Sequence, residues 1–376
     1  MDSLSFDIYA LLIPLLSRNT LAKLCLVNRA FQQTFTPSLY AHLPREAAVP
    51  SYSQWAALKS SIEDNPALLQ HVQRMNIHLS LYIESGRMLY WTEGFWQLQL
   101  LPRLRNLQVL ELEFCFCREA EGTPKCLDIA MLPHEHWEFL TFLHTLRIRS
   151  NTHKTDGTIV VNVLSTLFQR LRKSTRLSTL VLCNIHDTVL DQITFDTTPF
   201  PSSLDKLAIE GDIYAISNFR RFRPLVTDVK LELSRRTAAI IGQASSRPVR
   251  DCDPVGESIQ PYSNTTTLTI TGYMIEPLSA AIWQQFWSRF PACVLLRLKS
   301  DGYGYDSEKA QGLHLLDGQH WPTQVEHLQL DLPGLHRFDL VSLLQNSGLK
   351  VLHVRANARY KYSGNTSLVS SASADT

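Results

Sequence analysis

One short apolar pattern recurs along most of this 376-residue chain and limits what the chain can fold into. The pattern is L-x-x-L-x-L, and its last four residues alternate polar and apolar side chains, as a half-buried β-strand does. Its clearest copies start at Leu107, Leu143, Leu177, Leu204 and Leu349. Weaker copies start at Val72, Val226, Thr265, Cys293 and Val325. Many short strands separated by helix-length segments predict an α/β protein built from repeats.

This pattern is typical of a leucine-rich repeat. In such a unit the x-L-x-L portion is a short strand, and the leucine three residues earlier packs beneath the turn that leads into it. One unit cannot bury its apolar residues alone, so neighbouring units stack into an irregular solenoid with one continuous core. Amphipathic segments at 158–174, 276–290 and 338–348 are expected to be helices on its convex side. The alternative is an ordinary α/β domain whose strands are rich in leucine.

The chain divides into regions of different composition. Residues 1–45 are predicted to form a small helical module, 46–70 a helical linker, and 71–357 the solenoid. Within the solenoid, residues 234–264 contain several prolines and little periodicity, which predicts a loop insertion. The Ser-rich tail at 358–376 is predicted to be disordered.

The overall composition excludes several classes of function. The chain has 36 basic and 35 acidic residues, so its charge does not indicate binding to nucleic acid or to a membrane surface. No apolar run reaches the length of about 20 residues that a membrane helix needs. Seven cysteines are an odd and scattered set, unlike a disulfide framework. We therefore expect a reducing compartment, cytoplasmic or nuclear.

The amino-terminal module carries more apolar side chains than one helix face can bury. Residues 6–16, "FDIYALLIPLL", predict a short helix interrupted at Pro14. Asn19 or Thr20 is expected to cap a second helix that runs from Leu21 and stops at Thr36-Pro37, before a short third element. Forty residues of this kind bury too little surface to fold alone. The two helices must therefore cover each other, the solenoid end or a partner with their surplus apolar residues.

These residues resemble the F-box motif, in particular the variant that precedes divergent leucine-rich repeats in fungal proteins. The matching positions are Leu4, Asp7, Ile8, Ile13, Leu16, Leu21, Leu24, Leu26, Val27, Asn28, Arg29, Phe31, Pro37, Leu39 and Tyr40. The family usually begins with Leu-Pro, where this chain has Leu4-Ser5.

The resemblance implies a substrate-recognition subunit of an SCF-type E3 ubiquitin ligase. Its helices would bind a Skp-type adaptor, and through it a cullin–RING ligase, while the repeats hold a target protein. By the resemblance, the residues divided between adaptor contact and internal packing are Ile8, Leu12, Leu16, Leu24, Leu26, Val27 and Phe31. The alternative is a leucine-rich-repeat interaction scaffold without a ubiquitin role, in which these helices only cap the solenoid.

Target binding is expected on the solvent-facing x positions of the strands. The basic residues and histidines among them are Arg147, Arg149, Lys230, Arg297, His327 and His353. The segment "NFRRFRP" adds Arg220, Arg221 and Arg223, interleaved with phenylalanines. Arginine pairs with two oxygens of a carboxylate or phosphate, so an acidic or phosphorylated segment is a candidate ligand there. The alternative is that these phenylalanines are core residues and the arginines between them are solvated.

We expect no catalytic, metal or cofactor site. His134 and His136 share a side only in extended backbone and lack a third ligand at a recognisable spacing. Cys115 and Cys117 do not form the C-x-x-C pair of a zinc module. The segment "GYGYDS" lacks the strand, helix and lysine of a phosphate-binding loop, and no nucleophile elbow is present.

Overall fold

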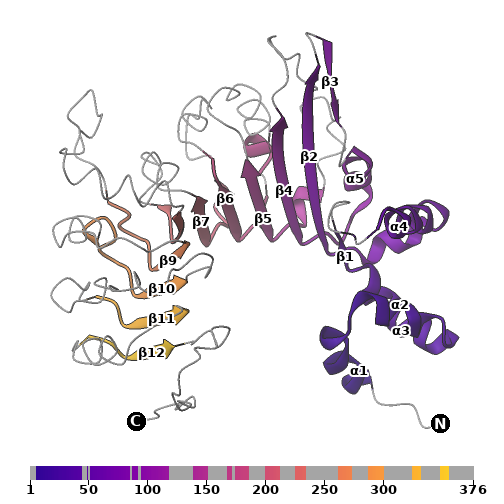
Figure 1. Cartoon of the computed structure of the whole chain (residues 1–376), viewed down its shortest axis with the longest axis horizontal. Coiled ribbons are helices and arrows are strands. Elements are labelled where there is room, and N and C mark those ends of the chain that lie inside the picture. Colours follow the sequence, from indigo (N-terminus) through magenta and orange to yellow (C-terminus); the bar gives the residue numbers. More distant parts are fainter. Residues whose placement is uncertain are drawn as a thin grey trace, which may run out of the picture. The chain divides into compact units, whose positions relative to one another are not determined.

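A computed structural model gives the fold of the chain (Figure 1). It describes residues 6–44, 49, 51–84, 87–91, 95–117, 139–150, 167–171, 174–185, 200–211, 225–233, 261–272, 287–299, 324–331 and 348–354. The chain divides into two compact units, Met1–Asp228 and Val229–Thr376. Both contain parallel strands, and the first adds helices, so the predicted α/β class is confirmed.

The first unit opens with helices. They are α1 (Phe6–Leu12), the 3-10 turn η1 (Ile13–Leu15), α2 (Arg18–Cys25), α3 (Arg29–Tyr40), α4 (Tyr52–Asp64), η3 (Pro66–His71), α5 (Phe95–Leu100) and η4 (Leu101–Arg103). The predicted interruption at Pro14 is confirmed, because α1 gives way to η1 there. A helix expected between residues 46 and 70 is also confirmed, as α4.

The expected single helix from Leu21 to Thr36 is wrong, since the chain breaks between α2 and α3. Asn28 adopts extended backbone (φ −162°, ψ 171°), and its side-chain oxygen accepts a 2.8 Å hydrogen bond from the Phe31 N–H. Asparagine is among the strongest N-cap residues, so it starts a new helix at this point. The break leaves Leu26 and Val27 in the turn between the two helices.

Two further details of this region differ from expectation. The cap of α2 is Ser17, whose hydroxyl accepts a 3.2 Å hydrogen bond from the Thr20 N–H, so neither Asn19 nor Thr20 is the cap. Helix α3 also continues through Pro37 to Tyr40. Proline removes one helical hydrogen bond, but Phe35 is fully buried beside it and α3 packs against η3 and β1. Tertiary packing therefore carries the helix past the proline.

The strands of the first unit follow the chain in order. They are β1 (His42–Leu43), β2 (Arg74–Glu84), β3 (Arg87–Trp91), β4 (Val109–Cys117), β5 (Thr145–Ser150), β6 (Thr179–Cys183) and β7 (Lys206–Gly211). Each pairs in parallel with the next in the order β1-β2-β4-β5-β6-β7, and β3 alone is an antiparallel partner of β2. Figure 1 shows α2 and α3 between α1 and the edge strand β1.

The strands of the second unit also follow the chain in order. They are β8 (Asp228–Leu233, whose first residue closes the first unit), β9 (Thr267–Gly272), β10 (Leu295–Lys299), β11 (His327–Asp331) and β12 (Val351–Val354). Strands β9 to β12 pair in parallel and in chain order. Each described copy of the L-x-x-L-x-L pattern therefore contains a strand, as predicted.

The apolar residues of the pattern form continuous rows across each unit. In the first unit Leu110, Leu146, Leu180 and Leu207 are register neighbours, and all are buried. The leucines that precede β4, β5 and β6, namely Leu107, Leu143 and Leu177, are completely buried, whereas Leu204 and Leu349 before β7 and β12 are half-buried. In the second unit Leu268, Leu296 and Leu328 form the corresponding buried row.

One backbone contact recurs at the start of the strands and holds them in this register. The N–H groups of Gln108 and Val109, for example, both donate to the carbonyl of Gln73, at 2.8 and 3.0 Å. The other carbonyls that accept two successive N–H groups in this way belong to Ala41, Gln108, His144, Ser178, Thr266, Val294 and Glu326. The same local geometry is therefore repeated from strand to strand in each unit.

Several predicted features lie outside the described residues. These are Arg220, Arg221 and Arg223, His134 and His136, most of the loop 234–264, the loop "GYGYDS" and the tail 358–376. Of the expected outer helices, residues 167–171 are helical and bury Leu167, Phe168 and Leu171. At the end of the predicted loop, Tyr262 is buried and its ring stacks on Phe290 at 5.2 Å.

Candidate protein-binding surfaces

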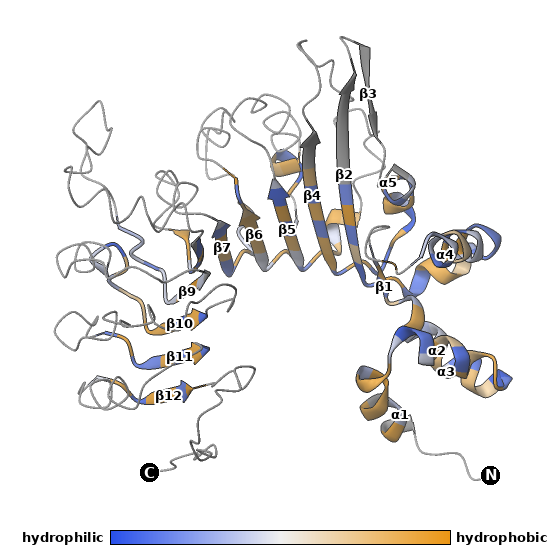
Figure 2. Cartoon of the chain, viewed as in Figure 1, coloured by the Kyte–Doolittle hydropathy of each residue, from blue (hydrophilic) through white to orange (hydrophobic). Residues whose placement is uncertain are grey.

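The amino-terminal helices leave large apolar side chains in solvent. Leu11 and Leu15 are 74% and 79% exposed, and Leu26 and Val27 in the turn after α2 are 86% and 63% exposed. Ile8 and Leu12 are exposed to a smaller degree. We refer to these six residues as the exposed apolar set. Figure 2 shows α1 coloured largely hydrophobic, whereas a surface helix normally turns its apolar residues inward.

A separate small core holds these helices together. The rings of Tyr9, Phe31 and Phe35 meet edge to face, with centroids 5.5 to 6.0 Å apart, and join α1 to α3. Leu21 on α2 is only 6% exposed, and α2 packs against α3. The exposed apolar set is therefore surplus to the packing of the module. Several large apolar side chains left in solvent on one small module are typical of a site of interaction with other macromolecules.

The structure separates the seven residues that the F-box resemblance implies into two groups. Ile8, Leu12, Leu26 and Val27 are exposed and available to a partner. Leu16, Leu24 and Phe31 are half-buried. Sequence reasoning missed Leu11 and Leu15, because nearly every residue of this segment is apolar and spacing alone does not single them out.

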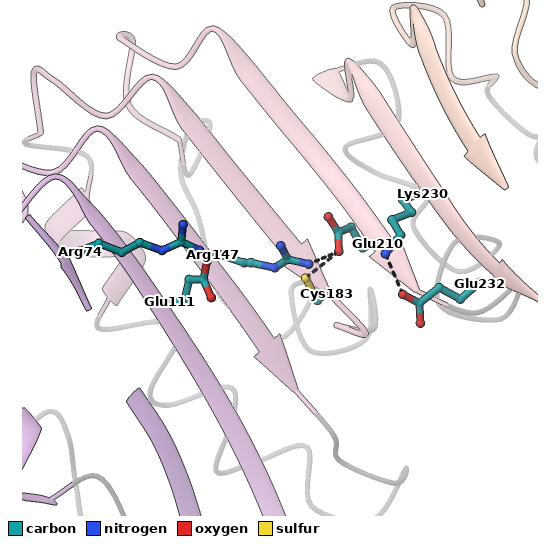
Figure 3. A network of polar contacts seen from close by, with 7 residues as sticks. All are labelled: Arg74, Glu111, Arg147, Cys183, Glu210, Lys230 and Glu232. Carbon is teal, nitrogen blue, oxygen red and sulfur yellow. Dashed lines mark hydrogen bonds and ion pairs between the residues drawn. The ribbon is translucent and has the colours of Figure 1, made fainter. Parts of the chain in front are cut away.

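Charged side chains line the polar positions of the first unit's strands (Figure 3). Arg74 on β2 pairs with Glu111 on β4 at 2.5 Å. Arg147 on β5 reaches across β6 to form an ion pair with Glu210 on β7. Lys206 at the start of β7 pairs with Asp228 at 2.7 Å. Most cations on this side of the first unit therefore already have an anion.

Cys183 on β6 belongs to the same network. Its thiol donates a hydrogen bond to Glu210 at 3.5 Å, beside the Arg147 guanidinium (Figure 3). Burial, helped by the Glu210 charge, raises the pKa of the Cys183 thiol to about 11. The thiol is therefore protonated at neutral pH and acts as a hydrogen-bond donor, whereas a reactive cysteine needs a lowered pKa.

The predicted target-binding residues that the structure describes differ in their pairing. Arg147 is committed to Glu210, and Lys230 on β8 pairs with Glu232 at 3.1 Å. Arg149, two residues after Arg147 on β5, lies on the same side of the strand. It makes no hydrogen bond or ion pair within the described part of the chain.

The remaining predicted residues lie together in the second unit. Arg297 on β10 and His353 on β12 both flank Gln329 on β11 in the strand register. His327 precedes Gln329 by two residues and so shares its side of the sheet. The structure therefore brings Arg297, His327 and His353 to one face, which spacing along the sequence could not show.

No protein-family model matches the chain, and a search of curated proteins finds no similar sequence. Among the described helices, none has the length and apolar character to cross a membrane. The described residues also contain no group of three His, Cys, Asp or Glu side chains that could hold a metal ion.

Proposed function

We propose that this chain is the substrate-recognition subunit of an SCF-type E3 ubiquitin ligase. The observation that carries the proposal is the exposed apolar set on the amino-terminal helices, where the F-box resemblance places the adaptor contacts. Residues 1–45 would bind a Skp-type adaptor and through it a cullin–RING ligase. The chain would then act without catalysis of its own, in the cytoplasm or the nucleus.

The energetics favour a protein partner for this surface. Burying a large apolar side chain stabilises a complex by about 1.5 to 3 kcal/mol. Leu11, Leu15 and Leu26 keep most of their surface in water in the free chain, so each has most of that gain still available. A few such anchors supply most of the affinity of a typical protein interface.

We further propose that the strands of residues 71–357 stack as an irregular leucine-rich-repeat solenoid whose polar strand positions hold the target. The repeated carbonyl contact at the strand starts and the buried rows of leucine support this arrangement. Parallel strands that pair strictly in chain order are what successive stacked repeats produce.

A second candidate is a repeat scaffold in which the helices only cap the first strand. Its support is that α3 leads directly into the edge strand β1 and packs against η3. Terminal repeats need such caps. A cap, however, gains its stability from buried residues, and this role gives no reason for the exposed apolar set.

Adaptor binding distinguishes the two candidates. We would co-express the full chain with a Skp-type adaptor and analyse the purified material by size-exclusion chromatography. The variant Leu26→Asp/Val27→Asp should abolish the one-to-one complex, because it places charges at the exposed anchors. Leu225→Asp is the matched control, since Leu225 is an exposed leucine outside these helices. A wild-type chain that ignores the adaptor would contradict the proposal.

A further inference from the structure

Two cations on one strand of the second unit have no partner among the residues that the structure describes. Arg297 and Lys299 on β10 are both exposed. Neither makes a hydrogen bond or an ion pair to any residue that the structure describes. We refer to them as the β10 cation pair. They contrast with Arg74, Arg147 and Lys206, the first-unit cations whose charge is neutralised within the chain.

The neighbouring strands surround the β10 cation pair with hydrogen-bonding groups. Thr269 on β9 and Gln329 on β11 flank Arg297 in the register, and His353 on β12 lies beyond Gln329. Asp331 is the single acidic residue in the described strands β9 to β12. It is the register neighbour of Lys299, yet no ion pair joins the two within the described structure. Cationic and neutral polar side chains therefore dominate this face.

We propose that this face binds an acidic, extended segment of the target protein, through carboxylates that contact Arg297 and Lys299. The proposal rests on the proposed function, because it names the class of substrate. Arginine can bind both oxygens of one carboxylate, while lysine offers a single charged contact. Both side chains are already exposed, so a ligand can reach them without opening the core.

The spacing of the two cations sets the pattern of the ligand. They lie two residues apart on one strand, which is about 6.6 Å along the strand axis. Alternate residues of an extended peptide have the same spacing and point to the same side. The expected motif is therefore an acid, any residue, and a second acid, with the peptide following β10. Gln329 and Thr269 would then meet its polar groups from either side.

The test uses the full chain and a fluorescently labelled peptide of alternating Ser and Glu, with its Ser–Gln counterpart as the neutral probe. We expect the acidic peptide to bind and the neutral peptide not to bind. Reversing both charges in Arg297→Glu/Lys299→Glu should weaken binding of the acidic peptide about ten-fold or more, since each exposed ion pair contributes up to about 1 kcal/mol. The matched control is Arg103→Glu/Arg105→Glu, which makes the same charge change at two exposed residues of the first unit, at the end of η4 and in the turn after it.

A charge-swap experiment distinguishes a local effect at β10 from an effect of the changed net charge of the chain. An alternating Ser–Lys peptide should bind the Arg297→Glu/Lys299→Glu variant better than it binds wild type, and no such gain should appear in the Arg103→Glu/Arg105→Glu control. An equal loss of affinity for the acidic peptide in Arg297→Glu/Lys299→Glu and in the Arg103→Glu/Arg105→Glu control would overturn the proposal. Competition by a single-stranded oligonucleotide as strong as that by the acidic peptide would also overturn it, in favour of a nucleic-acid ligand.

The result of the peptide-binding experiment can be distinguished from the result of the adaptor-binding experiment. The β10 substitutions lie far along the chain from the amino-terminal helices, so the Arg297→Glu/Lys299→Glu chain should still form the complex with the adaptor. Failure of peptide binding with a normal adaptor complex would refute the acidic-segment proposal alone. Peptide binding by a chain that ignores the adaptor would instead refute the ubiquitin-ligase role and keep the acidic-segment site.

Discussion

Leu26 and Val27 provide the sharpest test of how the amino-terminal helices use their apolar residues. Leu26 is 86% exposed, so only about one seventh of its surface is covered in the free chain. Because fully burying a leucine is worth about 1.5 to 3 kcal/mol, Leu26 contributes about 0.2 to 0.4 kcal/mol to folding. Val27 is 63% exposed and adds about 0.5 to 1 kcal/mol by the same reasoning. The double variant Leu26→Ala/Val27→Ala should therefore cost at most about 1.4 kcal/mol of stability.

The same pair should matter far more in the adaptor complex. Truncating both side chains removes apolar surface that would be buried at the interface, and so lowers the binding free energy by about 3 kcal/mol. This corresponds to a loss of affinity of about a hundredfold. Leu21→Ala should have the opposite effect, a loss of stability in the free chain. Leu21 is buried on α2, which packs against α3, and truncating a core leucine costs about 2 to 5 kcal/mol of stability.

Two measurements on each variant separate these effects. Titration calorimetry with the adaptor gives the dissociation constant, and amide hydrogen exchange in α2 and α3 gives the local stability of the helices. We expect normal exchange and weak binding for Leu26→Ala/Val27→Ala, and accelerated exchange for Leu21→Ala. Accelerated exchange in both variants would show that Leu26 and Val27 are packing residues and would refute the reasoning. Unchanged affinity in the double variant would refute it as well.

Other predictions follow from single contacts. Asn28→Ala should destabilise α3 by about 1 kcal/mol, because the cap of its first turn is lost, and circular dichroism melts should show this where Asn28→Ser does not. Gln97→Leu should cost about 2 kcal/mol or more in thermal stability, since the buried amide donates to the Pro44 and Asn76 carbonyls at 2.8 and 3.1 Å, and an unchanged melting temperature would contradict this. For Cys183 the folded-state pKa of about 11 exceeds the ordinary value of 9.0. The folded chain then holds a proton that the unfolded chain releases, so this contribution to stability is present below pH 9 and is lost towards pH 11. Melts between these pH values should fall more steeply for wild type than for Cys183→Ala.

Much of the fold follows from local patterns in the sequence. The x-L-x-L alternation decides where each described strand lies, because alternate side chains of a strand point to opposite sides and only one side can be apolar. Pro14 interrupts the first helical segment for an equally local reason, since proline is a poor interior residue in a helix. The break at Asn28 was equally local, but the apolar spacing across it resembled one helix and concealed the cap.

The two binding surfaces depend on contacts that the sequence pattern does not show. Leu21 and Leu26 are both leucines in one amphipathic stretch, yet the first is buried where α2 packs against α3 and the second is left in solvent. Arg147 and Glu210 are 63 residues apart and meet only because their strands share a register.

The same register distinguishes cations that are otherwise alike in sequence. Arg147 and Arg297 occupy equivalent positions of the repeat, but an anion lies within reach of the first and no described anion pairs with the second. Local alternation therefore determined which residues face solvent on the strands. Tertiary structure decided which of those residues are neutralised and which remain available, because pairing depends on distances between strands and not on spacing along the chain.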